Sequence, residues 1–279
     1  MKNPIKKMAP AALCAMVLSA VLANIAAAAP REVIVGARNG FQGVAYVDEN
    51  GNYTGLEAEV LKQVFKALPQ YKFDIRYLEQ RSLFPSLLTN KVDMVQGNLR
   101  RNEVREKNAI RTRVAHNWTP YVITVPDANT QIHSLADLEG KRIAQNKNSG
   151  QAGIMEQYIK SHNANIEIVY SPEMLTLLAD GQVDAVISPV FNVPQFNAAH
   201  KNYKLKYVGE PVGGEAGTPD NDPNAYFWFR PDDKQLRDDV SAVIAKLRAD
   251  GTLSRLSRQF LSEDYPARID QKAEENLTQ

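Results

Sequence analysis

Apolar residues along the chain switch repeatedly between a period of two and a helical period, which predicts alternating strands and helices. Strand patterns are short apolar or alternating runs, found at 32–35, 73–77, 92–95, 141–144, 166–168 and 183–187. Helical stripes recur every three or four residues, at 56–68, 83–88, 149–162, 236–247 and 253–260. Another helix is expected to start at Ser171-Pro172-Glu173, with serine as its cap and proline in its first turn. Repeated strand–helix alternation predicts parallel sheets flanked by helices, an α/β fold.

The alternation forms two series of similar size with no disordered linker between them. Two lobes packed face to face would leave a cleft, and such clefts bind small ligands and close around them by hinge motion. We expect lobe 1 at 29–121, lobe 2 at 122–206, and a return to lobe 1 with C-terminal helices at 207–265. The stretch 266–279 is polar and lacks apolar periodicity, so it is expected to be a disordered tail.

The N-terminus has the composition of a secretory signal peptide. Lys2, Lys6 and Lys7 precede an uncharged, alanine-rich run that ends in four alanines before Pro30. We expect residues 1–28 to be removed on export to the periplasm. A retained membrane anchor is the alternative, although Pro10 and the weakly apolar alanines argue against it. Cleavage would also remove the only cysteine and leave 30 basic and 32 acidic residues.

The composition of the chain and the motifs that it lacks limit the functions that we expect. The 279 residues are 44% hydrophobic and 23% charged with a net charge of +1, which gives no reason to expect nucleic acid as a partner. The four histidines are scattered without metal-ligand spacing, and no nucleophile elbow, phosphate loop or dinucleotide fingerprint occurs. We therefore expect neither a metal nor a cofactor.

Short strings occur along the chain in an order typical of one family. They are Val33-Ile-Val-Gly36, Gly51 to Leu56 before Glu57-Ala-Glu59, Leu83-Phe-Pro-Ser-Leu-Leu, Lys91-Val-Asp93-Met, 98–105, Trp118-Thr-Pro-Tyr121, Leu138-Glu-Gly-Lys-Arg, Gly181-Gln-Val-Asp184-Ala and Leu247-Arg-Ala-Asp-Gly-Thr-Leu. From 31 to 265 the chain resembles the polar amino-acid-binding family of periplasmic solute-binding proteins that serve ABC importers (family 3). The resemblance implies a type II periplasmic-binding-protein-like fold, with a ligand cleft between its lobes. It also implies a binding protein rather than an enzyme, here expected to be a monomer that delivers its ligand to a membrane permease.

The resemblance also implies which residues form the ligand site. Arg105 matches the arginine that forks onto the ligand's carboxylate, a role suited to paired guanidinium donors. Ser149 would cap a helix whose free amides face the cleft and attract an anion. Phe41 matches an aromatic that packs over the ligand, although a purely structural role is equally open. The remaining matched positions are Gly97, Asn98, Arg100, Asn148 and Gly150.

Two departures from the family pattern bear on the ligand. The aspartate that usually anchors an α-ammonium group is replaced by Pro189, and no acid occurs from 185 to 200. Cationic residues appear instead, at Arg38, Arg100 and Lys147, which predicts a basic cleft. The hypothesis is an anionic ligand with two or more acidic groups, either an acidic amino acid or an organic acid. An amino group remains possible in principle, with Glu57 or Asn192 as its acceptor.

An enzyme on the same fold is the second hypothesis, because exported cyclohexadienyl dehydratases resemble these binding proteins. Such chemistry needs a positioned proton donor or acceptor in the cleft. Glu57 and Glu59 are the candidate acids near the matched site, and a plain surface position is open for both.

Overall fold

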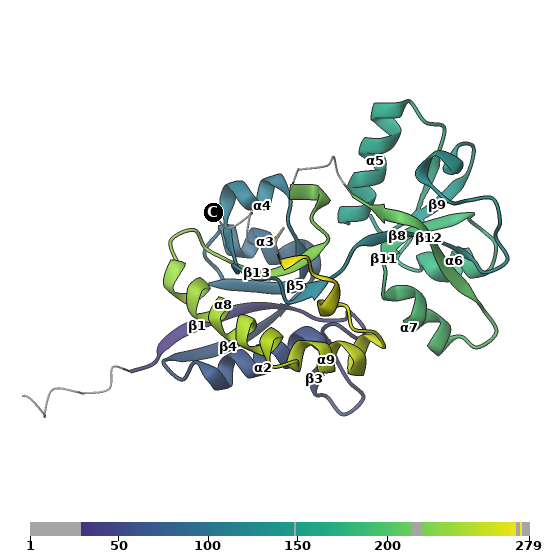
Figure 1. Cartoon of the computed structure of the whole chain (residues 1–279). Helices are drawn as coiled ribbons and strands as arrows, with labels where there is room; N and C mark the ends of the chain where they lie inside the picture. The colour runs from purple at the N-terminus through teal and green to yellow at the C-terminus, as the bar shows by residue number, and fades with distance from the viewer. Residues whose placement is uncertain (1–28, 148, 214–218, 272–273, 275–279) are drawn as a thin grey trace, which may run out of the picture.

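The computed structural model describes residues 29–147, 149–213, 219–271 and 274, and it forms two lobes (Figure 1). The expected signal peptide, residues 1–28, lies outside the described residues. The chain crosses between the lobes at 119–121 and returns between Val212 and Asn224. Each lobe has its own sheet and buried core, as the two series of strands and helices predict.

The sheet of lobe 1 has the strand order β4-β1-β5-β13-β6, with β7 also paired to β13. Strand β1 runs parallel to β4 and β5, whereas β13 runs antiparallel to β5. The six strands are β1 (Arg31–Arg38), β4 (Tyr71–Leu78), β5 (Met94–Arg100), β6 (Ile110–Arg111), β7 (Asn117–Trp118) and β13 (Asn224–Phe229). A small hairpin of β2 (Tyr46–Val47) and β3 (Tyr53–Thr54) lies beside this sheet.

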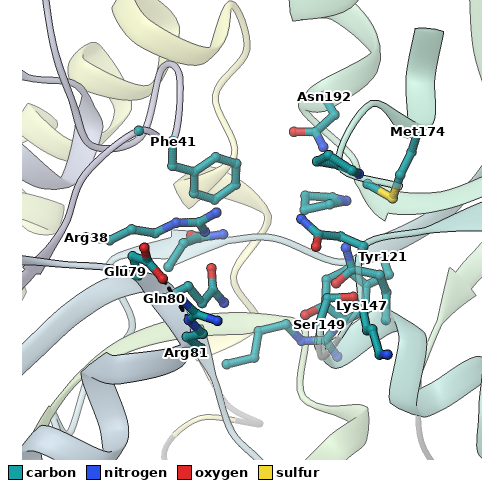
Figure 2. A pocket seen from close by; sticks show the side chains of 17 residues that line it. Arg38, Phe41, Glu79, Gln80, Arg81, Tyr121, Lys147, Ser149, Met174 and Asn192 are labelled. Atoms are coloured by element: carbon teal, nitrogen blue, oxygen red, sulfur yellow. Dashed lines mark hydrogen bonds and ion pairs between the residues drawn. The ribbon is translucent and has the colours of Figure 1, made fainter. Parts of the chain in front are cut away.

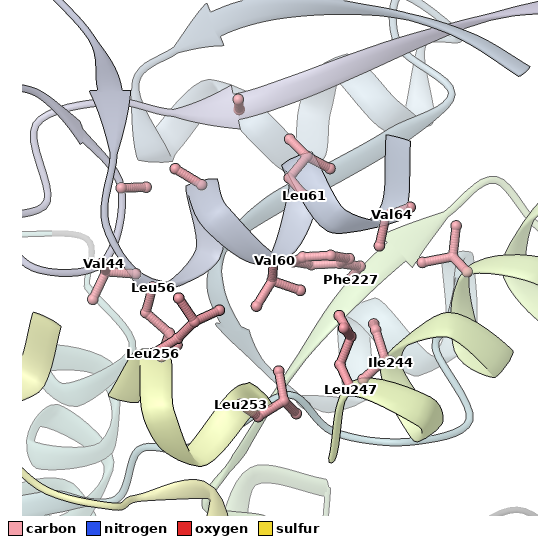
Figure 3. Close-up of a cluster of buried hydrophobic side chains, with 14 of the residues drawn as sticks. Val44, Leu56, Val60, Leu61, Val64, Phe227, Ile244, Leu247, Leu253 and Leu256 are labelled. Atoms are coloured by element: carbon pink, nitrogen blue, oxygen red, sulfur yellow. The ribbon is translucent and has the colours of Figure 1, made fainter. Parts of the chain in front are cut away.

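Helices cover lobe 1. They are α2 (Leu56–Ala67), α3 (Gln80–Leu88), α4 (Glu103–Asn108), α8 (Lys234–Ala249) and α9 (Thr252–Leu261). All of them except α4 bury apolar side chains against the lobe. Figure 3 shows Leu56 and Val60 of α2 in the same buried cluster as Leu253 of α9, with Val60 beside Phe227 of β13. These four side chains are fully buried, and each burial of this kind contributes about 1.5–3 kcal/mol to stability.

Lobe 2 is built on the strand order β10-β9-β11-β8-β12. Its strands are β8 (Tyr121–Pro126), β9 (Arg142–Gln145), β10 (Glu167–Tyr170), β11 (Ala185–Pro189) and β12 (Leu205–Val212). Its helices are the 3-10 turn η1 (Leu135–Leu138), α5 (Gly150–His162), α6 (Met174–Ala179) and α7 (Asn192–Ala199). Strands β9, β10 and β11 run parallel, whereas β8 runs antiparallel to β11 and β12.

Both sheets are therefore mixed, where the alternation predicted parallel sheets. The antiparallel strands β8, β12 and β13 are those that carry the chain between the lobes and back. The expected boundary at residue 206 falls inside β12, so lobe 2 extends to Val212. Strand β13 went unpredicted because its six residues are all buried and do not alternate.

Two local predictions are wrong. Helix α6 begins at Met174, with Glu173 and not Ser171 at its N-cap position. The Ser171 hydroxyl instead accepts a hydrogen bond from the Glu173 amide at 3.1 Å, which stabilises a turn before the helix. The tail is not wholly disordered either, because η3 (Pro266–Arg268) and the buried side chains of Ile269 and Glu274 pack against lobe 1.

Candidate ligand-binding cleft

A cavity of about 710 Å³ lies between the lobes, lined by residues of both. Its lining segments follow the carboxyl ends of parallel strands in each sheet: β1, β4 and β5 in lobe 1, and β9, β10 and β11 in lobe 2. In open α/β sheets, ligands bind at this edge because loops and helix N-termini converge there. The fold alone therefore marks the cavity as the candidate ligand site.

Lobe 1 contributes a cation stacked on an aromatic ring. The Arg38 guanidinium carbon lies 3.8 Å from the centroid of the Phe41 ring, and both side chains point into the cleft (Figure 2). Burial lowers the pKa of Arg38 to about 10, an effect that the nearby charge of Glu57 opposes. The group therefore stays cationic at neutral pH. Phe41 also packs on Phe191, with 5.6 Å between ring centroids, so it has a structural contact as well as a place in the cavity wall.

The rim of lobe 1 carries an ion pair that the sequence did not reveal. Glu79 and Arg81 both line the cavity, and Arg81 Nε lies 2.7 Å from Glu79 Oε2. Both side chains are more than two-thirds exposed, so the pair contributes little to stability. Glu79 is the one acidic residue in the described wall of the cavity.

The segment after Gly97 reaches the cavity through a distortion of β5. Asn98 lines the wall with a left-handed backbone, at φ 55°, a conformation that asparagine tolerates better than most residues. A Cβ added at Gly97 would lie 2.7 Å from Leu83 Cδ1, so a larger residue there would displace the Leu83 side chain of α3. The glycine thus allows α3 to pack closely beneath the site.

Arg100 and Arg105 lie at different depths. The Arg100 side chain is almost fully buried, stacks on Tyr121 at 4.3 Å, and donates from Nε to the Asp222 carbonyl at 2.9 Å. Arg105 does not line the 710 Å³ cavity. It lines a smaller adjoining pocket with Gly150, and it donates a hydrogen bond to the Arg100 carbonyl.

Lobe 2 presents the N-terminus of α5 to the cavity. The Ser149 hydroxyl caps this helix by accepting a hydrogen bond from the Ala152 amide at 3.2 Å, as the sequence predicts. Lys147 lies just before the helix in the lobe-2 wall of the cavity, with its Nζ 5.9 Å from the centroid of the Tyr170 ring. A helix N-terminus beside a lysine favours an anionic group. Asn148, the remaining residue predicted here, lies outside the described residues.

The carboxylates that were candidates for an ammonium or a proton-transfer role lie elsewhere. Glu57 is fully buried, and both its oxygens accept the Asn98 amide hydrogen, at 2.9 and 2.8 Å. Glu59 pairs with Lys62 at 2.7 Å, and neither glutamate lines the cavity. Asn192 does line it, close to Pro189, and so remains available as a neutral acceptor.

Several wall residues were not among those that the sequence predicted for the ligand site. They are Gln80, Tyr121, Asn146, Gln151, Pro172 and Met174, together with Glu79 and Arg81. What most of them share is their place in the fold, because they lie directly after a strand or at the start of the helix that follows it. Topology would have found them once the strand order was known.

Charge in the described wall is strongly unbalanced. Arg38, Arg81, Arg100 and Lys147 face a single acid, Glu79, which is already paired with Arg81. Among the described residues no group of three or more histidine, cysteine or carboxylate side chains is arranged to hold a metal ion. The cleft therefore offers cationic and neutral hydrogen-bonding groups to whatever enters it.

A polar cavity at the strand ends of two linked α/β lobes defines a two-lobed ligand-binding protein. The chain belongs to the bacterial extracellular solute-binding proteins, family 3, whose model matches residues 33–263. It is 34% identical to the L-cystine-binding protein TcyJ of Bacillus subtilis over 84% of this chain and 85% of that protein. It is 32% identical to TcyK, another L-cystine-binding protein of that organism, over 84% of each chain.

The fold agrees with this membership. The crystal structure of the L-cystine solute receptor of Neisseria gonorrhoeae, in its unliganded open conformation, matches with a TM-score of 0.62 and 22% identity. The match covers 85% of this chain and 95% of that one. The chain is thus an extracytoplasmic solute-binding protein of the amino-acid importer family. Within the described ranges, the helices lack the combined length and apolarity needed to cross a bilayer.

Proposed function

We propose that the chain captures a small solute bearing at least two carboxylates in the periplasm and delivers it, as a monomer, to the permease of an ABC importer. L-cystine is the first candidate, because two relatives above 30% identity are named for binding it. L-cystine carries two carboxylates and two ammonium groups. An anionic dicarboxylic amino acid or organic acid is the other form that the same cationic wall would accept.

The proposal rests mainly on the surroundings of Arg38 in the cavity wall. Its guanidinium lies in the cavity wall, and among the described residues no carboxylate forms an ion pair or hydrogen bond with it. Most other arginines of lobe 1 lie within 4 Å of a carboxylate, as Arg101 does with Glu106 and Arg230 with Asp93. Holding a desolvated cation without a direct partner is costly. A ligand carboxylate would supply the missing partner with paired hydrogen bonds.

The second carboxylate would meet the opposite wall. The N-terminus of α5 lies in the lobe-2 wall of the cavity, opposite the lobe-1 wall that holds Arg38, and Ser149 fixes where that helix begins. Lys147 lines the same lobe-2 wall. A ligand with one carboxylate for each wall would bridge the lobes and favour their approach by hinge motion at the two crossing segments. Arg105, beside Gly150 in the adjoining pocket, would come to the ligand as the lobes close.

Amino groups on the ligand would meet weaker acceptors. The aspartate expected of the family is absent, and Glu57 is buried away from the cavity. Glu79 at the rim and the amide oxygen of Asn192 are the acceptors that remain in the described wall. The carboxylates are therefore expected to contribute more to affinity than the ammonium groups.

Isothermal titration calorimetry on purified, ligand-stripped protein tests this function with matched pairs. L-cystine is compared with S-methyl-L-cysteine, which has one carboxylate, and L-glutamate with L-glutamine. Tighter binding of the two-carboxylate member in at least one pair supports the proposal. Preference for L-arginine or for the one-carboxylate members in both pairs would overturn it.

A further inference from the structure

We propose that Glu57, together with His116, is a positioning residue for the ligand site. The buried carboxylate would hold the backbone of Asn98 in the conformation that faces the cavity. This inference rests on the proposed function, because it assigns Glu57 a role in preparing that binding site. It also replaces the roles that the sequence left open for Glu57, as an ammonium acceptor or a catalytic acid.

The geometry starts from a bulge in β5. Tyr226 of β13 pairs with Leu99 and Trp228 with Val95, so one residue of β13 lies opposite the three residues 96–98 of β5. Extra residues on one strand take backbone amides out of the ladder, and such bulges are common beside functional sites. The amide of Asn98 lies in this bulge, next to the cavity.

Glu57 accepts the hydrogen bond that the ladder no longer accepts. The Asn98 amide donates to both carboxylate oxygens of Glu57, at 2.9 and 2.8 Å. A backbone amide buried without an acceptor is costly, and a left-handed residue that is not glycine is strained. The carboxylate therefore stabilises the left-handed conformation of Asn98 by accepting the amide that this conformation turns away from β13.

His116 completes the buried pair. Its ring nitrogen Nε2 lies 2.5 Å from Glu57 Oε1, and both side chains are fully buried. The other ring nitrogen, Nδ1, has no hydrogen-bond partner among the described residues. The ring proton therefore belongs on Nε2, where it is donated to Glu57. The Glu57 carboxylate thus accepts hydrogen bonds from two N–H donors, the Asn98 amide and His116 Nε2. Glu57→Gln replaces one carboxylate oxygen by an NH2 group, so one N–H donor would then face another.

The Asn98 side chain is fixed by the segment that leads into lobe 2. Its Nδ2 donates to Thr119 Oγ1 at 2.8 Å, and its Oδ1 accepts from Asn117 Nδ2 at 3.2 Å. The first chain crossing starts at Thr119, so Asn98 connects the cavity wall to the hinge. Glu57 thus stabilises a cavity residue whose side chain also contacts the crossing segment directly.

The test compares Glu57→Gln with two controls on the same helix. Glu59→Gln changes a partly exposed glutamate two residues away that pairs with Lys62, and Val60→Ala destabilises the buried face of α2 without touching the site. For Glu57→Gln we expect a loss of at least tenfold in affinity for L-cystine, with the full panel of matched ligands as further probes. Both controls should keep wild-type affinity, although Val60→Ala lowers the melting temperature.

A second measurement decides the proposal without a ligand. In ¹H–¹⁵N spectra of the ligand-free protein, the Asn98 amide should shift upfield and exchange faster with solvent in Glu57→Gln, but not in either control. If the glutamine variant does not fold, Glu57→Asp keeps the charge on a shorter side chain, and the same changes are expected. The proposal would be overturned if the shift and exchange rate of the Asn98 amide were unchanged in the Glu57 variant. It would also be overturned if that variant kept wild-type affinity while its melting temperature fell as in Val60→Ala. If the wild type binds none of the probes, the proposed function fails while the amide measurement still decides the role of Glu57.

Discussion

Replacing Arg38 by methionine removes the cation from the cavity wall and keeps most of the apolar stem that stacks on Phe41. A hydrogen bond to a charged group contributes about 1.5–3 kcal/mol, so the dissociation constant for a two-carboxylate ligand should rise about 10- to 150-fold. The ligand-free protein should not lose comparable stability. Losing the contact with Phe41 costs about 0.5–1 kcal/mol, and removing a desolvated charge offsets part of it.

Two assays on the same preparations separate these effects. Calorimetry gives the affinity, and thermal unfolding without ligand gives the stability, for which 1 kcal/mol corresponds to about 2–4 °C in a chain of this size. Arg76→Met is the matched control, because Arg76 lies on the neighbouring strand β4, about half exposed, and outside the cavity wall. Wild-type affinity in Arg38→Met would refute the reasoning, as would an equal loss in Arg76→Met.

Three further outcomes follow from the structure. Ser149→Ala removes the cap of α5, so it should destabilise the protein by about 1 kcal/mol in thermal unfolding and weaken ligand binding severalfold in calorimetry. Unchanged affinity would show that the N-terminus of α5 does not contribute to ligand binding. Glu274→Gln breaks the ion pair with Arg248, at 2.8 Å, and weakens the acceptor for the Ala115 amide, so the melting temperature should fall with affinity unchanged. Small-angle scattering with saturating ligand should show a smaller radius of gyration, and an identical profile would contradict closure of the lobes.

Most of the fold could be predicted because its helices and parallel strands carry regular apolar spacing. The stripe that begins at Leu56 is α2, and Ser149 caps α5 as its local sequence indicates. The buried strand β13 carries no alternation, because both of its faces are covered. The C-terminal segment reads as polar, yet Glu274 is buried by pairing with Arg248, a contact between residues 26 apart. Such pairing cannot be inferred from local pattern.

The ligand site, like the fold, could be predicted only in part. Arg38, Phe41, Asn98, Arg100 and Ser149 line the cavity, and each was reached by resemblance or by charge. The residues that were missed are neutral, or they lie on a rim whose position depends on strand order. The burial of Glu57 could not be predicted for a different reason, because its place in the sequence is equally compatible with an exposed acid. Only the bulge in β5 explains why a carboxylate is buried there.

Native mass spectrometry of the gently purified protein tests the central claim most directly, followed by release and identification of whatever small molecule remains bound. The cationic wall around Arg38 predicts a released solute with at least two carboxylates, present at about one copy per chain and lost from Arg38→Met. A basic amino acid, or a neutral solute with a single carboxylate, released from the wild type at that ratio would contradict the account.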